Sequence, residues 1–156
     1  SPTSTAVVVQ SVYTQSGAVA TGTTVIPLDD TIPAETEGTE FITRAITPTS
    51  ATNILVIEHI GYYAHTALGS RNIISALFQD TTTAALAAGT TRTSSANQVV
   101  LFSLRHQMVA GTTSATTFKI RTGSDAAGTI TINGVAGARL FGGVMASSLR
   151  ITEVVP

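Results

Sequence analysis

The stretch that decides the fold is Asn53-Ile-Leu-Val-Ile-Glu-His-Ile-Gly-Tyr-Tyr63, the longest apolar run in the first half of the chain. Its β-branched and aromatic residues favour a strand. Similar runs occur on both sides of it, at residues 7–13, 39–47, 71–79, 98–108, 115–122, 128–133 and 138–154. Their periodicity is that of strands, so the sequence predicts an all-β protein.

The run from Val7 to Tyr13 is apolar at both alternating positions, because Val7, Val9 and Tyr13 alternate with Val8 and Val12. Successive side chains of a strand point to opposite faces. This pattern therefore predicts a strand that is covered on both faces.

Clusters of turn-forming residues separate the runs. Asn133-Gly134 predicts a tight hairpin turn, because both residues tolerate a positive φ. Pro27 and Pro33 bracket residues 28–32, and proline is excluded from central strands. We expect that segment to be an ordered loop that crosses from one sheet to the other.

Residues 81–88 are the one helix-like piece of the sequence. Asp80 or Thr81 could cap it, the alanines around Leu86 favour a helix, and Gly89 would end it. One short helix among so many strands leaves the all-β class unchanged.

Evenly spaced strands of this number indicate a sandwich or barrel. We expect a jelly-roll-like β-sandwich of about eight to ten antiparallel strands, with residues 6–156 as a single domain and residues 1–5 as an N-terminal tether. A chain of 156 residues can bury roughly 68–70% of the surface that its unfolded form exposes. It needs no metal or disulfide to build a core.

The composition argues against several classes of partner. The formal charge is −1 and only 11% of the residues are charged, whereas nucleic-acid binding needs a basic surface. No apolar run approaches the roughly 20 residues of a membrane span. We therefore expect neither a nucleic-acid partner nor membrane insertion. Without cysteine the chain has no disulfide and no thiolate metal site.

Two groups of segments resemble a known family. The first comprises Ile26-Pro-Leu-Asp-Asp-Thr-Ile-Pro33, Glu37-Gly-Thr-Glu-Phe41, Ile46-Thr-Pro-Thr-Ser-Ala-Thr-Asn53 and Ala76-Leu-Phe-Gln-Asp80. The second comprises Gly134, Arg139-Leu-Phe-Gly-Gly-Val144 and Leu149-Arg-Ile-Thr-Glu153. Together, from Val9 to Val154, they resemble domains of tailed-phage virion proteins, often at the C-terminus of tail fibres, tail spikes or minor structural proteins. The resemblance implies a virion location and trimerisation, and it transfers no ligand residues.

Catalytic patterns are weak, and we expect no enzyme. No Gly-x-Ser-x-Gly elbow is present. A carbohydrate-active enzyme is the alternative, and it needs two carboxylates about 5–9 Å apart. Asp29 and Asp30 are adjacent and would point in opposite directions on an extended segment, with Glu35, Glu37 and Glu40 close by. We interpret the aspartates as partners of turn amides, in preference to catalysis or calcium binding.

The histidines do not predict a metal site, and no cofactor is expected. His59 and His65 would share one face of a continuous strand, roughly 20 Å apart at about 3.3 Å per residue. His106 lies far away in sequence. The alternative is that three copies of one histidine meet on a trimer axis and bind an ion.

Ligand contacts are expected in loops at one end of the sandwich. Residues 62–71 combine aromatic rings, an imidazole and a guanidinium, and residues 90–97 carry a second guanidinium. The candidate glycan-binding residues are Tyr62, Tyr63, His65, Arg71 and Arg92. For each of them an ordinary core or solvent role is the alternative, and adjacent tyrosines on a strand point to opposite faces.

The candidate oligomer interface is the apolar run Phe141, Gly142, Gly143, Val144 and Met145. Glycine within a strand usually marks a bulge or a close backbone approach. We predict a bulge or tight packing at Gly142-Gly143, beside a contact between protomers.

The sequence thus predicts a homotrimeric structural module of a phage virion, in a tail fibre or spike, with possible binding of a host-surface glycan. Its other partners would be virion proteins. The alternative from the same class is a capsid decoration or head-fibre protein. Proteins of this kind and tail-fibre domains are both symmetric β modules, so the sequence does not separate them.

Overall fold

The computed structural model describes residues 6–156, so the predicted tether at residues 1–5 lies outside the described residues. The strands are β1 (Val7–Ser16), β2 (Ala20–Gly22), β3 (Thr39–Ile46), β4 (Ile54–His65), β5 (Arg71–Gln79), β6 (Ala87–Thr93), β7 (Val100–Val109), β8 (Thr116–Ser124), β9 (Ile130–Ile132), β10 (Gly134–Val135), β11 (Ala138–Arg139) and β12 (Ser147–Val155). A single 3₁₀ turn, η1 (Phe141–Gly143), is the only helical piece of the described residues. No helix in this part of the chain is long and apolar enough to cross a membrane.

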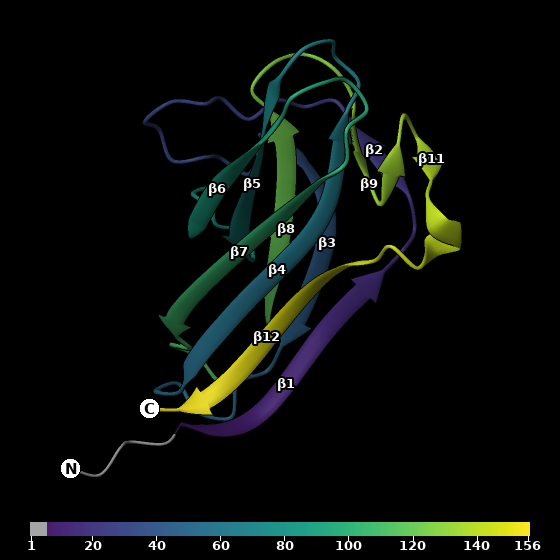
Figure 1. The fold of residues 1–156 in the computed structure, drawn as a ribbon. Coiled ribbons are helices and arrows are strands. Elements are labelled where there is room, and N and C mark those ends of the chain that lie inside the picture. The colour runs from purple at the N-terminus through teal and green to yellow at the C-terminus, as the bar shows by residue number, and fades with distance from the viewer. Residues whose placement is uncertain (1–5) are drawn as a thin grey trace, which may run out of the picture.

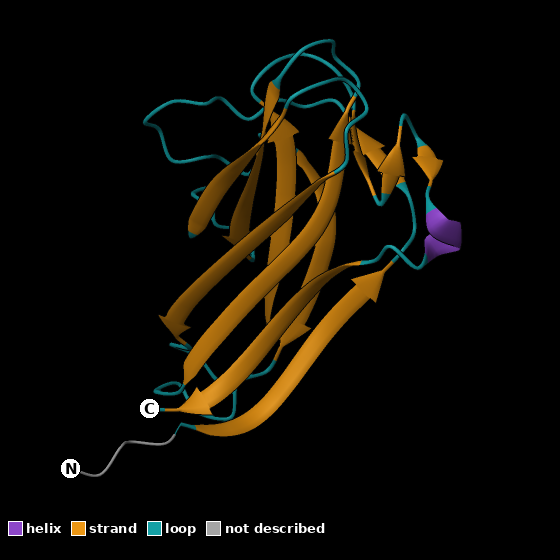
Figure 2. Cartoon of the chain, in the orientation of Figure 1, coloured by secondary structure: helices purple, strands orange, loops and turns teal. Residues whose placement is uncertain are grey.

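The long strands form two sheets packed as a sandwich (Figures 1 and 2). The six-stranded sheet contains β1, β12, β4 and β7 in that order, extended by the short β9 and β2. The four-stranded sheet has the order β3-β8-β5-β6. The long strands pair as nested antiparallel hairpins, β1 with β12, β3 with β8, β4 with β7 and β5 with β6. A long hairpin rolled up on itself gives this pairing, which is the topology of a jelly roll. The predicted fold is confirmed.

The core lies between the inner faces of the two sheets. Leu55 and Ile57 of β4 and Leu149 and Ile151 of β12 are buried in one cluster with residues of the opposite sheet. That sheet contributes Ile42, Ile46, Leu77, Phe118 and Ile120. The alternation of buried and exposed residues along β7, β8 and β12 is the two-residue period that the sequence predicted.

Glu153 is the charged exception in this interior. Its carboxylate is buried and accepts hydrogen bonds from Gln10 Nε2 (2.7 Å), Asn53 Nδ2 (2.7 Å) and the backbone N–H of Thr49 (2.8 Å), among others. Burial raises the pKa of Glu153, but these hydrogen bonds outweigh it and lower the pKa to about 2. Through these hydrogen bonds the carboxylate on β12 links β1 to the segment before β4.

The loop between Pro27 and Pro33 joins β2 of one sheet to β3 of the other. It contains no strand, as the flanking prolines predicted. In Figure 1 it extends to the side of the sandwich near β5 and β6.

The predicted helix at residues 81–88 is wrong. Residues 81–86 form an irregular segment in which Ala84 makes an isolated antiparallel bridge to Ala34, and Ala87 begins strand β6. The N–H of Leu86 donates to the carbonyl of Leu77 (2.7 Å), and β6 continues that pairing along β5. Helix propensity is a weak local preference, and a ladder of hydrogen bonds to a buried strand overrides it.

The predicted hairpin turn at Asn133-Gly134 is also misplaced. Asn133 has a positive φ of 59°, but Gly134 begins strand β10. The tight turn lies at Ala136 and Gly137, with φ values of 50° and 78°, between β10 and β11. Asn133 has another role, since its Nδ2 donates to the carbonyls of Ser16 (2.8 Å) and Ala18 (2.9 Å).

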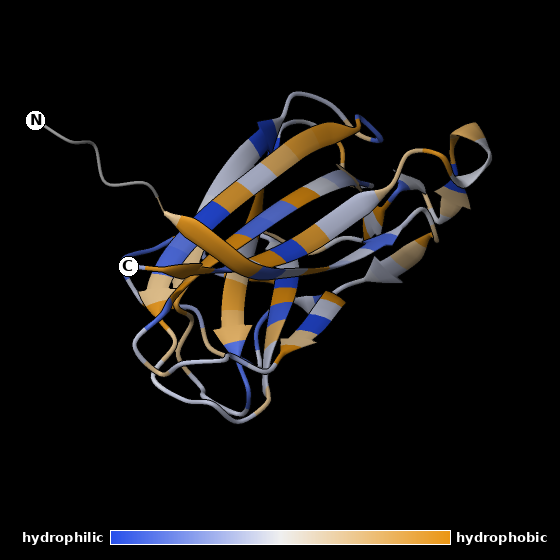
Figure 3. Cartoon of the chain, turned by 90° about the horizontal axis from the view of Figure 1, so that it is seen from below, coloured by the Kyte–Doolittle hydropathy of each residue, from blue (hydrophilic) through white to orange (hydrophobic). Residues whose placement is uncertain are grey.

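The expectation that residues 7–13 form a strand covered on both faces is wrong for the isolated chain. β1 is the edge strand of the six-stranded sheet and pairs only with β12. Val7, Val8 and Tyr13 are each more than half exposed. Figure 3 shows the start of β1 as a hydrophobic stretch at the margin of the sandwich.

Both described ends of the chain lie at the same end of the sandwich (Figure 1). Val7 pairs with Val155 there. The connections that follow β4, precede β7 and follow β8 lie at the opposite end. This opposite end, formed by residues 66–70, 94–99 and 125–129, is called the loop end below.

Candidate functional site

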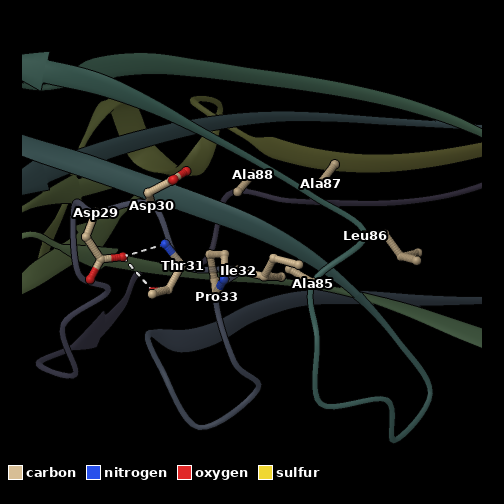
Figure 4. Close-up of a pocket in the computed structure, with 9 residues that line it drawn as sticks. All are labelled: Asp29, Asp30, Thr31, Ile32, Pro33, Ala85, Leu86, Ala87 and Ala88. Carbon is tan, nitrogen blue, oxygen red and sulfur yellow. Dashed lines mark hydrogen bonds between the residues drawn. The ribbon is translucent and has the colours of Figure 1, made fainter.

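A hollow on the surface lies between the loop at residues 27–33 and the start of β6. It has a volume of about 330 Å³ and is lined by Asp29, Asp30, Thr31, Ile32, Pro33, Ala85, Leu86, Ala87 and Ala88 (Figure 4). Its walls are apolar apart from Thr31 and the two aspartates. The sequence missed this hollow because four of its nine lining residues, 85–88, were predicted to be helical.

Asp29 and Asp30 point in different directions in this hollow (Figure 4). Asp29 accepts hydrogen bonds from the hydroxyl and the backbone N–H (2.9 Å) of Thr31. These bonds lower the pKa of Asp29. For Asp29, the interpretation as the partner of a turn amide is confirmed.

Of the three nearby glutamates, Glu40 lines a separate hollow of about 260 Å³. That hollow lies beside β1 and β3 and is lined by Thr14, Ser16, Ala18, Ala20, Glu40, Phe41, Ile42, Thr43, Ile132, Asn133 and Ser147. Asp29 and Asp30 therefore line one hollow and Glu40 lines another, while Glu35 and Glu37 line neither of the two. Neither hollow combines Glu40 with an aspartate.

Two of the predicted glycan-binding residues lie inside the molecule, which corrects their assignment. Tyr63 is fully buried, packs against Phe41 and donates its hydroxyl hydrogen bond to His59 Nε2 (2.9 Å). His65 is 1% exposed, and its Nδ1 accepts from the N–H of Ala67 (3.0 Å). Both side chains point to the inner face of β4, where a ligand cannot reach them.

Tyr62 points to the other face of the same strand. It is half-buried and lies opposite Leu101 of β7. The alternation of the two tyrosines was predicted, but the sequence could not say which of them faces the core. Tyr62 belongs to the exposed face of the six-stranded sheet, away from the two arginines.

Arg71 and Arg92 are brought together at the loop end. The Nη1 of Arg71 donates to the carbonyl of Ser70 (2.9 Å), and the Nη2 of Arg92 donates to the hydroxyl of the same serine (2.8 Å). In the register of β5 and β6, Asn72 lies opposite Arg92 and Arg71 lies opposite Thr93, so the two arginines occupy diagonal positions on opposite faces of the sheet. Of the five predicted residues, these two share Ser70 as a partner; Arg92 is exposed, whereas Arg71 is half-buried and its Nε is buried without a hydrogen-bond partner.

Asp125 is the neighbour of this cluster that the sequence did not identify. Its carboxylate accepts from Asn72 Nδ2 (2.6 Å). Burial raises the pKa of Asp125, but hydrogen bonds from Asn72 and Ser124 and the charge of Arg71 give a net lowering. Gly123 and Ser124 end β8, and no local sequence pattern indicates that Asp125, which follows them, meets β5.

The histidines do not gather into a metal site. His59 is 1% exposed, and its Nδ1 lies 2.9 Å from the carbonyl of Ser148. Burial lowers the pKa of His59 to about 4, although the bond to Ser148 opposes the shift. Burial and the charge of Arg71 also lower the pKa of His65. Among residues 6–156, no three His, Asp or Glu side chains are placed to hold one ion.

The predicted bulge at Gly142-Gly143 is a turn. Phe141, Gly142 and Gly143 form η1 between β11 and β12, with φ values of 50°, 64° and 93°. The expected close approach exists, because a Cβ on Gly17 would lie 1.7 Å from the carbonyl oxygen of Gly143. Phe141 and Val144 are 72% and 83% exposed, and an interface at these residues stays a prediction.

A second apolar region lies on the six-stranded sheet, on the face that points away from the core. This outer face consists of the alternate residues of β1, β12, β4 and β7 that are not in the interior. One row across it, the apolar row, is Val8, Val154, Ile54 and Val109. A second row, the charged row, is Tyr13, Arg150, Glu58 and Arg105. Ile60 and Leu101 follow toward the loop end.

Comparisons with known proteins assign no family. No protein-family model matches the chain, and no curated protein matches it. Matching solved structures include the infectious bursal disease virus VP2 subviral particle, at 10% identity and a TM-score of 0.36, over 96% of this chain and 39% of that one. Another is the infectious bursal disease virus Gx strain, at 9% identity and a TM-score of 0.37, over 93% and 40%. The chain thus spans about two fifths of each, and similarity at this level assigns no function.

Proposed function

We propose that the chain is a homotrimeric structural module of a phage virion, placed in a tail fibre or spike, that presents its loop end for host attachment. The observation that carries the proposal is the apolar surface left outside a complete core. The interior is closed by the two sheets, yet Val8, Tyr13 and Leu101 are 59%, 52% and 56% exposed.

Exposed apolar side chains gathered on one face mark a surface that contacts another protein. The low charge of the whole chain, 11% of residues, agrees with a domain partly covered by neighbours. A symmetric homo-oligomer is the commonest way to cover such a face.

The virion assignment is supported by the resemblance of residues 9–154 to phage virion domains and by the jelly-roll topology. Jelly rolls occur among viral capsid proteins and lectins. A fold alone does not determine function, so the topology supports the assignment only in combination with the sequence segments.

The attachment role is supported by the position of Arg71 and Arg92. Both guanidinium groups converge on Ser70 at the loop end, and the two described chain ends lie at the opposite end. Attachment of the domain through either chain end would leave the exposed Arg92 and the accessible part of Arg71 uncovered. In a trimer the cluster would occur three times, so weak contacts with a surface glycan would add through avidity.

The test is a paired pull-down with the purified domain. A tail-fibre or spike domain is expected to bind host cells and not purified capsids. Binding to capsids and not to cells would contradict the proposal and favour the capsid decoration or head-fibre alternative. Native mass measurement of the same sample checks the oligomer, with three times the 16.0 kDa chain mass expected.

A further inference from the structure

The charged row crosses the middle of the outer face, and its order gives that face two unlike halves. The β12 and β1 half carries Arg150 and Tyr13. The β4 and β7 half carries Glu58 and Arg105. Arg150 and Glu58 are directly opposite each other in the ladder between β12 and β4.

These halves are complementary to each other. A carboxylate and a cation–π acceptor are the partners that an arginine takes on a protein surface. Within one chain, Arg150 already lies over the ring of Tyr13, with Cζ 4.9 Å from the ring centroid. An ion pair could form between Glu58 of one chain and Arg150 of another. A cation–π contact could form between Arg105 of the first chain and Tyr13 of the second. Both halves of the face would then have partners in the neighbouring copy.

We propose that the outer face is the surface through which copies of this chain associate, around a symmetry axis that runs along the strands. This inference rests on the proposed homotrimer and names the surface that forms it. Rotation about an axis parallel to the strands keeps each row level with the same row of the neighbouring copy. The β4 and β7 half of one copy then meets the β12 and β1 half of the next, as a head-to-tail ring requires.

The other rows agree with this arrangement. At the level of the apolar row, Val109 and Ile54 of one copy meet Val8 and Val154 of the next, so apolar side chains meet apolar side chains. Ile60 lies near the middle of the face and is 45% exposed.

The edges of the region also favour association between copies. β1 and β7 are its two outer strands, and β1 is a long edge strand that contains neither lysine nor proline. Unprotected apolar edges of this kind are rare in monomers, because they pair with other chains. The proposed arrangement brings the β7 edge of one copy beside the β1 edge of the next.

The experiment compares native masses of the full chain and single variants of the face. Ile60→Asp and Leu101→Asp place a carboxylate in the contact, and both are expected to reduce the trimer to a 16.0 kDa monomer. The matched control is Leu68→Asp, since Leu68 is 85% exposed in the loop after β4 and lies off the outer face. It is expected to leave the mass unchanged. Melting temperatures check that each variant folds.

A charge exchange tests the pairing itself. Glu58→Arg alone and Arg150→Glu alone place like charges across the contact and are expected to dissociate the trimer. The double variant restores opposite charges between copies and is expected to restore the trimer mass.

The outcomes separate this inference from the proposed function. If the wild type is a trimer and Ile60→Asp, Leu101→Asp and both charge variants are trimers too, the outer face is not the association surface, but the proposed homotrimer is supported. A wild-type dimer that Ile60→Asp dissociates overturns the trimer and supports the face. A wild-type monomer overturns both.

Discussion

The two faces of the six-stranded sheet are built from the same strands and differ in what covers them. On the inner face, Leu149 and Ile151 are completely buried against the four-stranded sheet. On the outer face, Ile60 and Leu101 are 45% and 56% exposed. Both faces carry large aliphatic side chains, but only the inner one is closed by the chain itself.

This difference separates stability from assembly. Removal of apolar surface from water stabilises whichever state buries it. The inner face is buried whenever the chain folds. The apolar side chains of the outer face are removed from water only when another molecule covers them. Substitutions on the inner face should therefore change the stability of each chain, and substitutions on the outer face should change its association.

The largest expected effect is a cavity in the inner face. Leu149→Ala is expected to lower the free energy of unfolding by about 3–4 kcal/mol, because the site is fully buried in a packed core. Leu101→Ala, the matched change on the outer face, is expected to change the stability of the monomer by less than about 1 kcal/mol. Urea unfolding at low protein concentration checks both. Equal losses at the two sites would contradict the distinction between the faces.

The next effect concerns Glu153, the buried carboxylate of the inner face. Glu153→Ala leaves the N–H of Thr49 and the amide of Asn53 without their acceptor, so we expect a loss of about 3 kcal/mol. Glu153→Gln keeps the shape and is expected to lose less. Thermal unfolding of both variants measures the difference.

The same group gives the stability a pH dependence. The pKa of Glu153 is lowered to about 2 in the folded chain, below its ordinary value of 4.5. The stabilisation is therefore complete above pH 4.5 and is lost as the pH falls toward 2. Unfolding measured from pH 6 to pH 2.5 should show a smaller acid dependence in Glu153→Gln than in the wild type. Identical pH profiles would show that the carboxylate is not held as the charged form.

A smaller effect is expected where β1 ends against η1. Gly17→Ala forces a Cβ against the carbonyl of Gly143, so a loss of about 2 kcal/mol is expected. Gly143→Val meets no atom closer than 3.5 Å but has a φ of 93°, so its cost of about 1–2 kcal/mol comes from backbone strain. Melting temperatures give the costs, and native mass shows whether Gly143→Val also breaks the oligomer. If Gly143→Val leaves the melting temperature and the native mass unchanged, Gly143 is needed neither for the stability of the chain nor for the oligomer.

The strands could be predicted from the sequence because their period is local. β5 was predicted with the bounds that the structure has, Arg71–Gln79. The predictions that failed depend on partners distant in sequence. The alanines of residues 81–88 favour a helix locally. In the structure, the hydrogen bond from the N–H of Leu86 to the carbonyl of Leu77 begins a strand pairing instead. The sequence of β1 could not reveal that it lies at an edge.

The candidate site was less predictable for the same reason. Alternation showed that Tyr62 and Tyr63 face opposite sides, but only the packing of β4 shows that Tyr63 and His65 are inside. Arg71 and Arg92 meet at Ser70 through the register of β5 and β6, which no local pattern specifies. Asp125 joins them through β8.

The smallest effect on stability is expected at the loop end. The double variant Arg71→Ala and Arg92→Ala removes two hydrogen bonds to Ser70, and we expect a change below about 0.5 kcal/mol. Binding of the domain to host cells should nevertheless be lost. Arg44→Ala is the control, since Arg44 is exposed on β3 away from the loop end. Retained binding in the double variant would place attachment elsewhere.

Tyr63 and His65 are left unchanged in this experiment, because their replacement would disturb the core.

The measurement that tests the central claim most directly is oxidative footprinting of Tyr13 and Leu101 in the wild type and in Ile60→Asp. Both side chains are more than half exposed in the single chain. If the outer face is covered by other copies, they are oxidised slowly in the wild type and rapidly in the variant, while Leu68 reacts equally in both. Rapid oxidation of Tyr13 and Leu101 in the wild-type protein would show that the face is open and would contradict the account.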